Sequence, residues 1–449
     1  MKNLVDYNVF PIACGSSFGL ENESLFLLYS PILGTYALAT PDEIERLNNN
    51  IQKKPVTDWA KNEKELFPEP NEEEKVYRIT GLADVRKISI LPTFKCNFKC
   101  VYCYSAEGRD STVVNPDDVK RALDFFINPE RTKERELTIS YLGGGEPFLS
   151  WDIFKYSLDY SGELASRYGF QLINSVNTNG SILTDEILNY LVKYDVTVCV
   201  TFEIFEEIQN KQRGQWGKVK ANLERMLDAG VRVIISSIIT PDSVDKMPQL
   251  IGEVVTYYPR VRTVVFEPVV DVASNSFDVQ HTIEDFYHQY IAGFFEALSI
   301  AEQHRVRLLN SVIRKLWVVH TRFCDGEISL TPEGKISGCT SVSSPKERLF
   351  EEYNYGDASR REGVYIDEAK FESLLKTNVY TYEKCKDCFL KWHCCGGCQF
   401  RNELYSEEQL NIVCNFSRSF ATRYLLWKMS ISYFNEYGEE LDTFVDTIR

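Results

Sequence analysis

Short apolar runs alternate with longer amphipathic stretches from about residue 84 to residue 310. Six runs rich in β-branched residues predict strands at Lys87–Leu91, Leu137–Leu142, Gln171–Val176, Val196–Phe202, Val231–Ser237 and Thr263–Glu267. Segments with a helical period predict helices at 115–127, 151–168, 184–193, 216–229, 244–257 and 282–304. Six successive strand–helix units predict an α/β fold with a parallel sheet and right-handed crossovers. Their number fits a partial (β/α)6 TIM-like barrel better than a complete eightfold barrel.

Residues 1–78 have the pattern of a small separate α+β domain. Two strands of a hairpin are predicted at Ser24–Ser30 and Thr35–Thr40. A helix is predicted to begin at Pro41, with Thr40 as its N-cap.

The remaining boundaries follow from composition. The acidic, proline-containing segment 68–75 predicts a linker before a barrel domain at 79–310. Residues 311–449 are rich in cysteine and loops up to about residue 415, and helical after that. We therefore expect three domains.

The charge balance narrows the function classes. The chain has 50 Lys and Arg against 65 Asp and Glu, a formal net charge of −15, and no run of five basic residues. A general nucleic-acid binder needs a basic surface, so we expect no nucleic-acid partner. No apolar run approaches the ~20 residues of a membrane span, and the first residues lack a secretory apolar region. We expect a soluble, cytoplasmic protein without a membrane partner.

Cysteine usage indicates metal chemistry. The chain has 13 Cys and five His, and all cysteines except Cys14 and Cys199 fall into two regions. In a chain without an export signal, such clusters hold metals more often than disulfides. The first region, Cys96, Cys100 and Cys103, follows the first predicted strand with C-x3-C-x2-C spacing. Three thiolates on one loop can hold three irons of a cubane and leave the fourth iron open.

This spacing resembles the signature of the radical S-adenosylmethionine (SAM) superfamily, in which an aromatic residue, here Tyr102, precedes the last cysteine. The alternatives are a zinc loop without its fourth ligand and buried structural thiols. Gly143–Pro147, after the second predicted strand, contains the Gly-Gly-Glu-Pro of similar enzymes. The fourth strand departs from the family: it ends in Thr201-Phe-Glu-Ile204, where relatives commonly have Ser-hydrophobic-Asp-Gly.

The resemblance implies a set of SAM contacts at the ends of these strands. Glycine backbone approaches the methionine moiety, Glu146 accepts from its ammonium group, and Arg213 pairs with its carboxylate. For the ribose, Ser236 is preferred over Ser237, because only one of two neighbouring strand residues points inward. An ordinary Asn-Gly turn at Asn179 and a surface role for Arg213 are the alternatives. The full implied set is Tyr102, Gly144, Gly145, Glu146, Asn179, Thr201, Arg213 and Ser236.

The second cysteine region has a stricter pattern. It reads Cys324-x9-Gly334-x4-Cys339, then Cys385-x2-Cys388-x5-Cys394-x3-Cys398, and Cys414 after fifteen more residues. This resembles the seven-cysteine SPASM motif of radical SAM peptide and protein maturases. The resemblance implies auxiliary cluster II on Cys385, Cys388, Cys394 and Cys414, and auxiliary cluster I on Cys324, Cys339 and Cys398.

Auxiliary cluster I lacks one cysteine ligand. Asp325, Cys395, another oxygen donor or the bound substrate are the alternatives for its fourth position. A zinc-ribbon-like domain is the alternative for the whole region. Cys199 lies inside a predicted strand and is expected to be a core thiol, and Trp392 and His393 are expected to pack rather than bind a cofactor.

The resemblance also implies a function. Its cofactors are SAM and three [4Fe-4S] clusters, and its first step is cleavage of SAM to a 5′-deoxyadenosyl radical. The expected substrate is a ribosomally made precursor peptide, leader plus core, modified by a thioether or carbon–carbon cross-link. A flavodoxin- or ferredoxin-type protein is the expected electron donor, and residues 1–78 resemble a winged-helix-like leader-binding domain.

Two other functions are kept open. Anaerobic sulfatase maturation is one, although those relatives have Asp where this chain has Thr340. A non-catalytic iron–sulfur scaffold that binds a peptide is the other. The sequence identifies no catalytic base.

Overall fold

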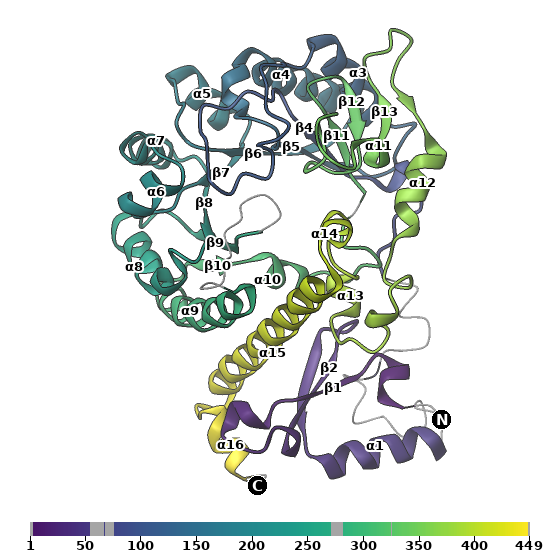
Figure 1. Ribbon diagram of the computed structural model, residues 1–449, viewed down its shortest axis with the longest axis vertical. Helices are drawn as coiled ribbons and strands as arrows, with labels where there is room; N and C mark the ends of the chain where they lie inside the picture. The colour runs from purple at the N-terminus through teal and green to yellow at the C-terminus, as the bar shows by residue number, and fades with distance from the viewer. Residues whose placement is uncertain (1–2, 54–66, 68–75, 271–281, 325, 448–449) are drawn as a thin grey trace. The chain divides into compact units, whose positions relative to one another are not determined.

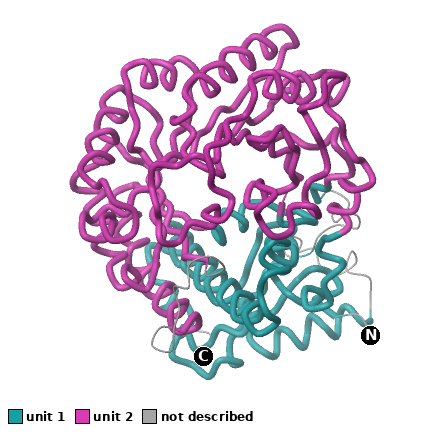
Figure 2. The backbone as a smooth tube through the Cα atoms, turned by 45° about the horizontal axis from the view of Figure 1, so that its top comes forward, with its two compact units in different colours: residues 1–78, 311–323, 377–449 teal, residues 79–310, 324–376 magenta. Residues whose placement is uncertain are grey.

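The computed structural model describes residues 3–53, 67, 76–270, 282–324 and 326–447 (Figure 1). Their contacts divide the chain into two compact units, coloured separately in Figure 2. Unit 1 contains residues 1–78, 311–323 and 377–449, and unit 2 contains residues 79–310 and 324–376.

Unit 2 is built on one large sheet. Its strands are β4 (Lys87–Ile90), β5 (Glu136–Tyr141), β6 (Gln171–Thr178), β7 (Thr197–Thr201), β8 (Val233–Ile239), β9 (Thr263–Pro268), β10 (Arg307–Leu309), β11 (Ile328–Leu330), β12 (Lys335–Ser337), β13 (Asn354–Asp357) and β14 (Tyr365–Ile366). In the described residues their order is β10-β9-β8-β7-β6-β5-β4-β11-β12-β13-β14. Pairing is parallel from β10 to β11 and antiparallel from β11 to β14. The six predicted strands are confirmed, each to within two residues.

Helices connect the parallel strands, as the sequence predicted. They are α3 (Pro116–Phe126), α4 (Trp151–Tyr168), α5 (Asp185–Lys193), α6 (Glu206–Gln212), α7 (Trp216–Asp228), α8 (Met247–Tyr257) and α9 (Ile283–Gln303), with α11 (Phe350–Tyr353) and α12 (Glu368–Lys376) later in the chain. Capping chemistry fixes several starts, since the side chains of Asn115, Thr184 and Thr282 accept from the backbone of their first turns. Helix α6 was not predicted, because its seven residues are too short for a clear period.

The two faces of the sheet differ in chemistry. One face is apolar and covered by helices: Tyr141 of β5 packs against Phe154 of α4, with ring centroids 4.3 Å apart. The opposite face carries a row of hydroxyl groups, because Ser89, Ser140 and Ser175 stand side by side in register on β4, β5 and β6. Ser175 Oγ donates to Ser140 Oγ at 3.0 Å. A sheet with one face under helices and one polar face fits the predicted partial barrel, and the fold class is confirmed.

Residues 324–376 extend this sheet. They supply β11 to β14, and β11 pairs with β4 in parallel. Gly334, the glycine of the second cysteine pattern, makes the β11–β12 turn with φ +74°, a left-handed conformation that suits glycine. The sequence analysis grouped these residues with 311–449, because strands of two to four residues show no readable alternation. The division into three domains stays a prediction.

Unit 1 contains a three-stranded antiparallel sheet of β1 (Phe10–Ala13), β2 (Phe26–Ser30) and β3 (Thr35–Ala39), in that order in the described residues. Its helices are α1 (Pro41–Lys53), α10 (Ser311–Leu316), α13 (Lys391–Cys394), α14 (Gln399–Leu404), α15 (Glu407–Tyr437) and α16 (Leu441–Thr447). Alternate residues of β2 face opposite sides: Leu27 and Tyr29 share a core with Leu425 of α15, and Leu28 shares one with Leu47 of α1. The predicted hairpin and helix are confirmed.

Two further expectations concern the predicted linker and membrane-spanning helices. The predicted linker, 68–75, lies outside the described residues. Across the part of the chain that the structure describes, no helix combines the length and the apolar character needed to cross a membrane.

Candidate functional site

The first cysteine motif lies on the loop that leaves the carboxyl end of β4. Cys96, Cys100 and Cys103 are all partly exposed and none forms a disulfide. Burial raises the pKa of the Cys100 thiol, the charges of Cys103 and Cys96 raise it further, and Arg213 and Arg109 oppose the shift. The three thiols therefore share one electrostatic environment, with two guanidinium groups beside it.

Neighbouring strand ends hold this loop in place. The backbone N–H of Val101 donates to the carbonyl of Gln212 at 3.0 Å. Asn97 Nδ2 donates to Ser181 Oγ at 2.8 Å, and Asn179 Nδ2 donates to Asn97 Oδ1 at 2.9 Å. Asn179, expected near SAM, thus links the end of β6 to the cysteine loop.

The glycine turn after β5 packs directly on the same loop. The N–H of Gly145 donates to the carbonyl of Thr93 at 2.9 Å, and that of Glu146 to the carbonyl of Lys95 at 2.8 Å. A Cβ on Gly145 would stand 2.0 Å from the Lys95 carbonyl oxygen. Gly144 has φ +64°, and a Cβ there would lie 3.1 Å from the Thr93 carbonyl oxygen. The turn therefore requires glycine for close approach of two backbone segments.

Glu146 is buried and already well bonded. Its carboxylate accepts from Thr178 Oγ1 at 2.7 Å, from the N–H of Asn179 at 2.7 Å and from the N–H of Phe148 at 3.2 Å. Burial raises the pKa of Glu146, and these hydrogen bonds oppose the shift. The side chain joins the turn after β5 to the end of β6, and its expected contact with the SAM ammonium group stays a prediction.

A second buried carboxylate organises the other side of the loop. The Tyr102 hydroxyl donates to Glu203 Oε1. Oε2 of Glu203 accepts from Ser237 Oγ at 2.7 Å and from the N–H of Ile238 at 3.0 Å. Arg213 Nη1 donates to the Tyr102 hydroxyl at 2.9 Å. Glu203, which is 0 % exposed, therefore connects the ends of β7 and β8 to the cysteine motif.

Arg213 stands between aromatic rings. Its guanidinium lies 5.7 Å from the ring centroid of Phe98 and 5.8 Å from that of Tyr102. Burial lowers its pKa, but the charges of Tyr102, Cys100 and Glu203 raise it more, so the net pKa is raised. Its Nε is buried and has no hydrogen-bond partner in the described residues. A buried guanidinium N–H without an acceptor is suited to bind an anionic ligand group such as the SAM carboxylate. That contact stays a prediction.

The structure separates the two serines at the end of β8. Ser237 is buried and bonded to Glu203, whereas Ser236 is partly exposed and paired in register with Thr201 of β7. Thr201 and Ser236 thus share the polar face of the sheet, where a ribose contact is geometrically open to them. Ile204, which replaces the usual family glycine, has φ +68° and is 1 % exposed. A β-branched residue in this conformation is strained.

The buried position of Glu203 predicts a pH dependence. Burial raises its folded-state pKa above the unfolded value, although Arg213 opposes the shift. Above the unfolded pKa, about 4.3 for Glu, the folded state binds more protons, so this group's contribution to the free energy of unfolding falls as pH rises. We expect the difference in unfolding free energy between wild type and Glu203→Gln, from urea titrations, to fall as pH rises from that value. A difference that rises with pH would contradict this.

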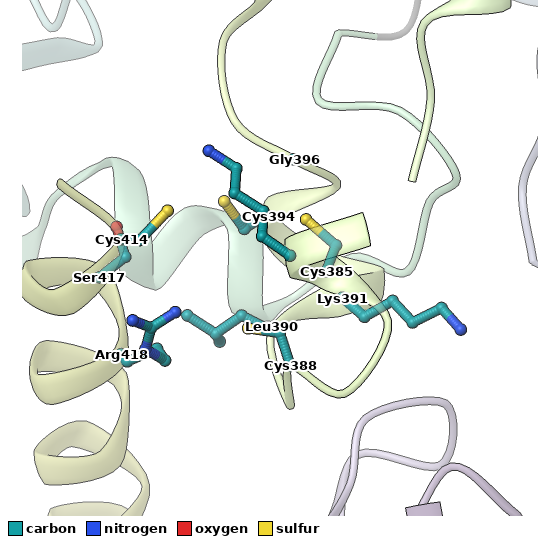
Figure 3. A pocket seen from close by; sticks show the side chains of 10 residues that line it. Cys385, Cys388, Leu390, Lys391, Cys394, Gly396, Cys414, Ser417 and Arg418 are labelled. Carbon is teal, nitrogen blue, oxygen red and sulfur yellow. The ribbon is translucent and has the colours of Figure 1, made fainter. Parts of the chain in front are cut away.

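The second set of cysteines lies in unit 1. Cys385, Cys388, Cys394 and Cys414 line one pocket, which Figure 3 shows with Cys414 entering from α15. Burial raises the pKa of Cys385 to about 11 and that of Cys394 to about 12, and the neighbouring thiols add to both shifts. Four thiols around one pocket form a donor set that metal binding would deprotonate.

The residues around this pocket pack as expected. Trp392 is 0 % exposed and its Nε1 donates to Asn8 Oδ1 at 2.8 Å. His393 lies within hydrogen-bond distance of the Tyr29 hydroxyl, 2.6 Å from Nε2, and of the Val318 carbonyl, 2.7 Å from Nδ1. The thiol of Cys395 donates to the His320 carbonyl at 3.0 Å.

The donor sets fit iron–sulfur ligation by their chemistry, because the cysteine loop and the pocket of unit 1 each offer several thiols, the ligands of such clusters. Cys324 and Cys339 belong to unit 2 and Cys398 to unit 1, and their ligand role stays a prediction. Asp325 lies outside the described residues.

The fold and the cysteine loop define a class of enzyme. Residues 90–252 match the family model of the radical SAM superfamily. The recognition made from the two cysteine patterns is confirmed: the chain contains a radical SAM domain and carries a SPASM-type cysteine pattern. A radical SAM domain indicates an enzyme that uses SAM and a [4Fe-4S] cluster.

Particular relatives are distant. The chain is 21% identical over 392 residues to the radical SAM cyclopropyl synthase TigE of Paramaledivibacter caminithermalis, covering 83% of this chain and 80% of TigE. It is 21% identical over 336 residues to the serine-type anaerobic sulfatase-maturating enzyme of Klebsiella aerogenes, covering 68% and 76%.

Solved structures share the fold. Native anSMEcpe with bound AdoMet has a TM-score of 0.63 at 16% identity, covering 77% of this chain and 98% of that one. Streptococcus suis SuiB bound to its precursor peptide SuiA has a TM-score of 0.53 at 14% identity, covering 84% and 95%.

Sequence reasoning missed two site residues. Glu203 was noted only as a departure from the family pattern, yet it is the buried acceptor for Tyr102 and Ser237. Its place two residues beyond β7 was the available signal. The contact of Arg109 with Cys103 could not be predicted, because Arg109 lies in a loop whose sequence has no periodic pattern.

Proposed function

We propose that the chain is a radical SAM/SPASM maturase that oxidatively modifies a ribosomally made precursor peptide. The observation that carries the proposal is the packing of the cysteine loop against the glycine turn, where Gly145 and Glu146 bond the backbone of Thr93 and Lys95. This joins a three-thiol iron site to a backbone surface suited to the methionine end of SAM.

The chain's own residues define how that site would work. When bound, a [4Fe-4S] cluster on Cys96, Cys100 and Cys103 together with SAM supplies a 5′-deoxyadenosyl radical for hydrogen abstraction. The backbone of the glycine turn would approach the methionine end of SAM and the Arg213 guanidinium would orient its carboxylate, with Thr201 and Ser236 beside its ribose. The polar face of the sheet would receive the substrate and hold its C–H group near the radical.

Cross-link formation also requires an electron acceptor. Removing a pair of hydrogens from the peptide releases one as the abstracted atom and the other as a proton and an electron. Auxiliary cluster II on Cys385, Cys388, Cys394 and Cys414 and auxiliary cluster I on Cys324, Cys339 and Cys398 are proposed to take that electron. A flavodoxin- or ferredoxin-type donor would supply the electron that starts each turnover.

A peptide substrate suits the relatives and the N-terminal sheet. SuiB is known in complex with a precursor peptide. In this chain, β3 pairs with β2 and has no second partner strand among the described residues, so β3 is the edge strand to which a leader strand would be added. Leader recognition by residues 1–78 is part of this proposal. Deleting them is a poor test, since Phe10, Leu27 and Tyr29 share a core with α15.

The test is an anaerobic reaction of the reconstituted enzyme with SAM, reductant and the precursor peptide. We expect 5′-deoxyadenosine, and precursor that has lost the mass of a pair of hydrogens. A core peptide without its leader should be modified more slowly than the full precursor. Production of 5′-deoxyadenosine with a precursor of unchanged mass, and no cross-link on fragmentation, would contradict the proposal.

Anaerobic sulfatase maturation is the second candidate, favoured by the likeness to the Klebsiella enzyme. The chain has Thr340 where those relatives have an Asp, and the Thr340 carbonyl oxygen packs near the glycine turn, 3.2 Å from a Cβ built on Gly143. Formylglycine formation on a C-x-P-x-R peptide would decide in its favour.

A further inference from the structure

Arg109 contacts the last cysteine of the SAM-cluster motif. Its Nη2 donates to Cys103 Sγ at 2.8 Å, and its Nη1 donates to the Phe98 carbonyl at 2.6 Å. The two nitrogens of one planar fork thus bridge the backbone of the cysteine loop and a thiol sulfur. This geometry suits arginine, whose donors are rigidly spaced.

Packing on both sides fixes the position of Arg109. Gly108 is buried, and a Cβ there would lie 2.7 Å from Glu347 Oε1. Asp110 pairs with Lys346 at 2.7 Å, although this exposed pair contributes little energy. The segment that follows Cys339 therefore fixes the position of Arg109 relative to the cysteine loop, mainly through the close contact at Gly108.

A cation that donates to a cluster sulfur has a defined electronic effect. Reduction adds one negative charge to the cluster, and both a nearby positive charge and an N–H···S hydrogen bond stabilise that charge. The reduced form gains more than the oxidised form, so the reduction potential rises. Arginine supplies both the positive charge and the N–H donors that this effect needs.

We propose that Arg109 is a positioning residue that raises the reduction potential of the SAM cluster through Cys103. The inference rests on the proposed function, because it requires a cluster on Cys96, Cys100 and Cys103. Its consequence is that a biological electron donor of a given potential reduces a larger fraction of the enzyme.

The test compares midpoint potentials rather than turnover. Wild type, Arg109→Gln, Arg109→Lys and the control Arg225→Gln are reconstituted anaerobically and titrated by EPR, with SAM added to mark the signal of the cluster that binds it. Arg225 bonds the Leu183 carbonyl and Asp185 instead. In Arg109→Gln we expect the ratio of reduced to oxidised SAM cluster to fall about tenfold at the wild-type midpoint, a shift of about 59 mV for one electron.

The other samples make the result decisive. Arg109→Lys keeps the charge but loses the fork, so its midpoint should fall between wild type and Arg109→Gln, while Arg225→Gln should match wild type. An Arg109→Gln enzyme with full iron and an unchanged or more positive midpoint overturns the inference. If Arg109→Gln loses iron, an Arg109→Lys midpoint equal to that of wild type overturns it. A wild-type enzyme without a SAM-sensitive signal overturns the proposed function itself.

Discussion

Replacing Cys96, Cys100 and Cys103 together with alanine is expected to abolish 5′-deoxyadenosine formation and to remove about four irons of about 12 in the reconstituted enzyme. The three thiols lie on one loop, and the charges of Cys96 and Cys103 raise the pKa of Cys100, so we expect them to act as one ligand set. The cysteines that line the pocket of unit 1 would keep their own iron. Iron and sulfide analysis, with chromatography of the SAM cleavage products, measures both effects.

Cys14→Ala is the matched control for the triple variant. Cys14 lies outside both cysteine patterns and is buried in the core of unit 1, whereas the cysteine loop belongs to unit 2. Its replacement should leave the iron content and the yield of 5′-deoxyadenosine unchanged. Zinc in place of iron in wild type, or unchanged iron in the triple variant, would mean that the motif is structural and the radical mechanism would be withdrawn.

Gly145→Ala is expected to cause a large loss by a purely steric route. The new Cβ would stand 2.0 Å from the Lys95 carbonyl oxygen and 2.8 Å from the Phe94 carbonyl carbon, both rigid backbone atoms. The glycine turn must then move away from the cysteine loop, which breaks the bond from Gly145 N–H to Thr93. Overpacking of this kind costs about 1–3 kcal/mol of stability, and a displacement of about 1 Å lowers the reaction rate by about 10²-fold.

Gly217→Ala provides the comparison. Gly217 lies in the first turn of α7, is exposed, and a Cβ there would meet no atom within 4 Å. Alanine in a helix is favoured over glycine by about 0.8–1 kcal/mol, so this variant should be as stable as wild type or slightly more so. Urea unfolding and SAM affinity are measured for both. A Gly145→Ala enzyme with wild-type SAM affinity would show that the turn is not part of the SAM site.

The strands and helices of the barrel follow from local pattern. The β-branched run at Val196–Phe202 and the helical period at 184–193 each depend on neighbouring residues only, so sequence reasoning placed both elements within two residues. The short strands β10 to β14 were missed, because two to four residues carry too little pattern. The pairing of β10 with β9 and of β11 with β4 joins segments that are distant in the sequence.

The candidate site, too, was predicted from the sequence only in part. The spacing of Cys96, Cys100 and Cys103 and the Gly-Gly-Glu-Pro segment indicated the radical SAM domain without a structure, and residues 90–252 match its family model. The structure shows contacts of two carboxylates that the sequence did not predict. Glu146 is hydrogen-bonded within the protein, and Glu203 is the shared acceptor of Tyr102 and Ser237. Such bonds join residues about 30 to 100 positions apart, so no local pattern contains them.

The sequence by itself determined the radical SAM domain, the alternating strand and helix order and the two groups of cysteines, because each depends on the spacing of near neighbours. Only the tertiary structure decided what stands beside the cysteines: the buried Glu203, the guanidinium of Arg213 and the fork of Arg109 on Cys103. Those contacts arise where parallel strand ends meet at one edge of the sheet. Hydrogen bonds and charge, which shape the reactivity of the site, act through space and therefore depend on the fold.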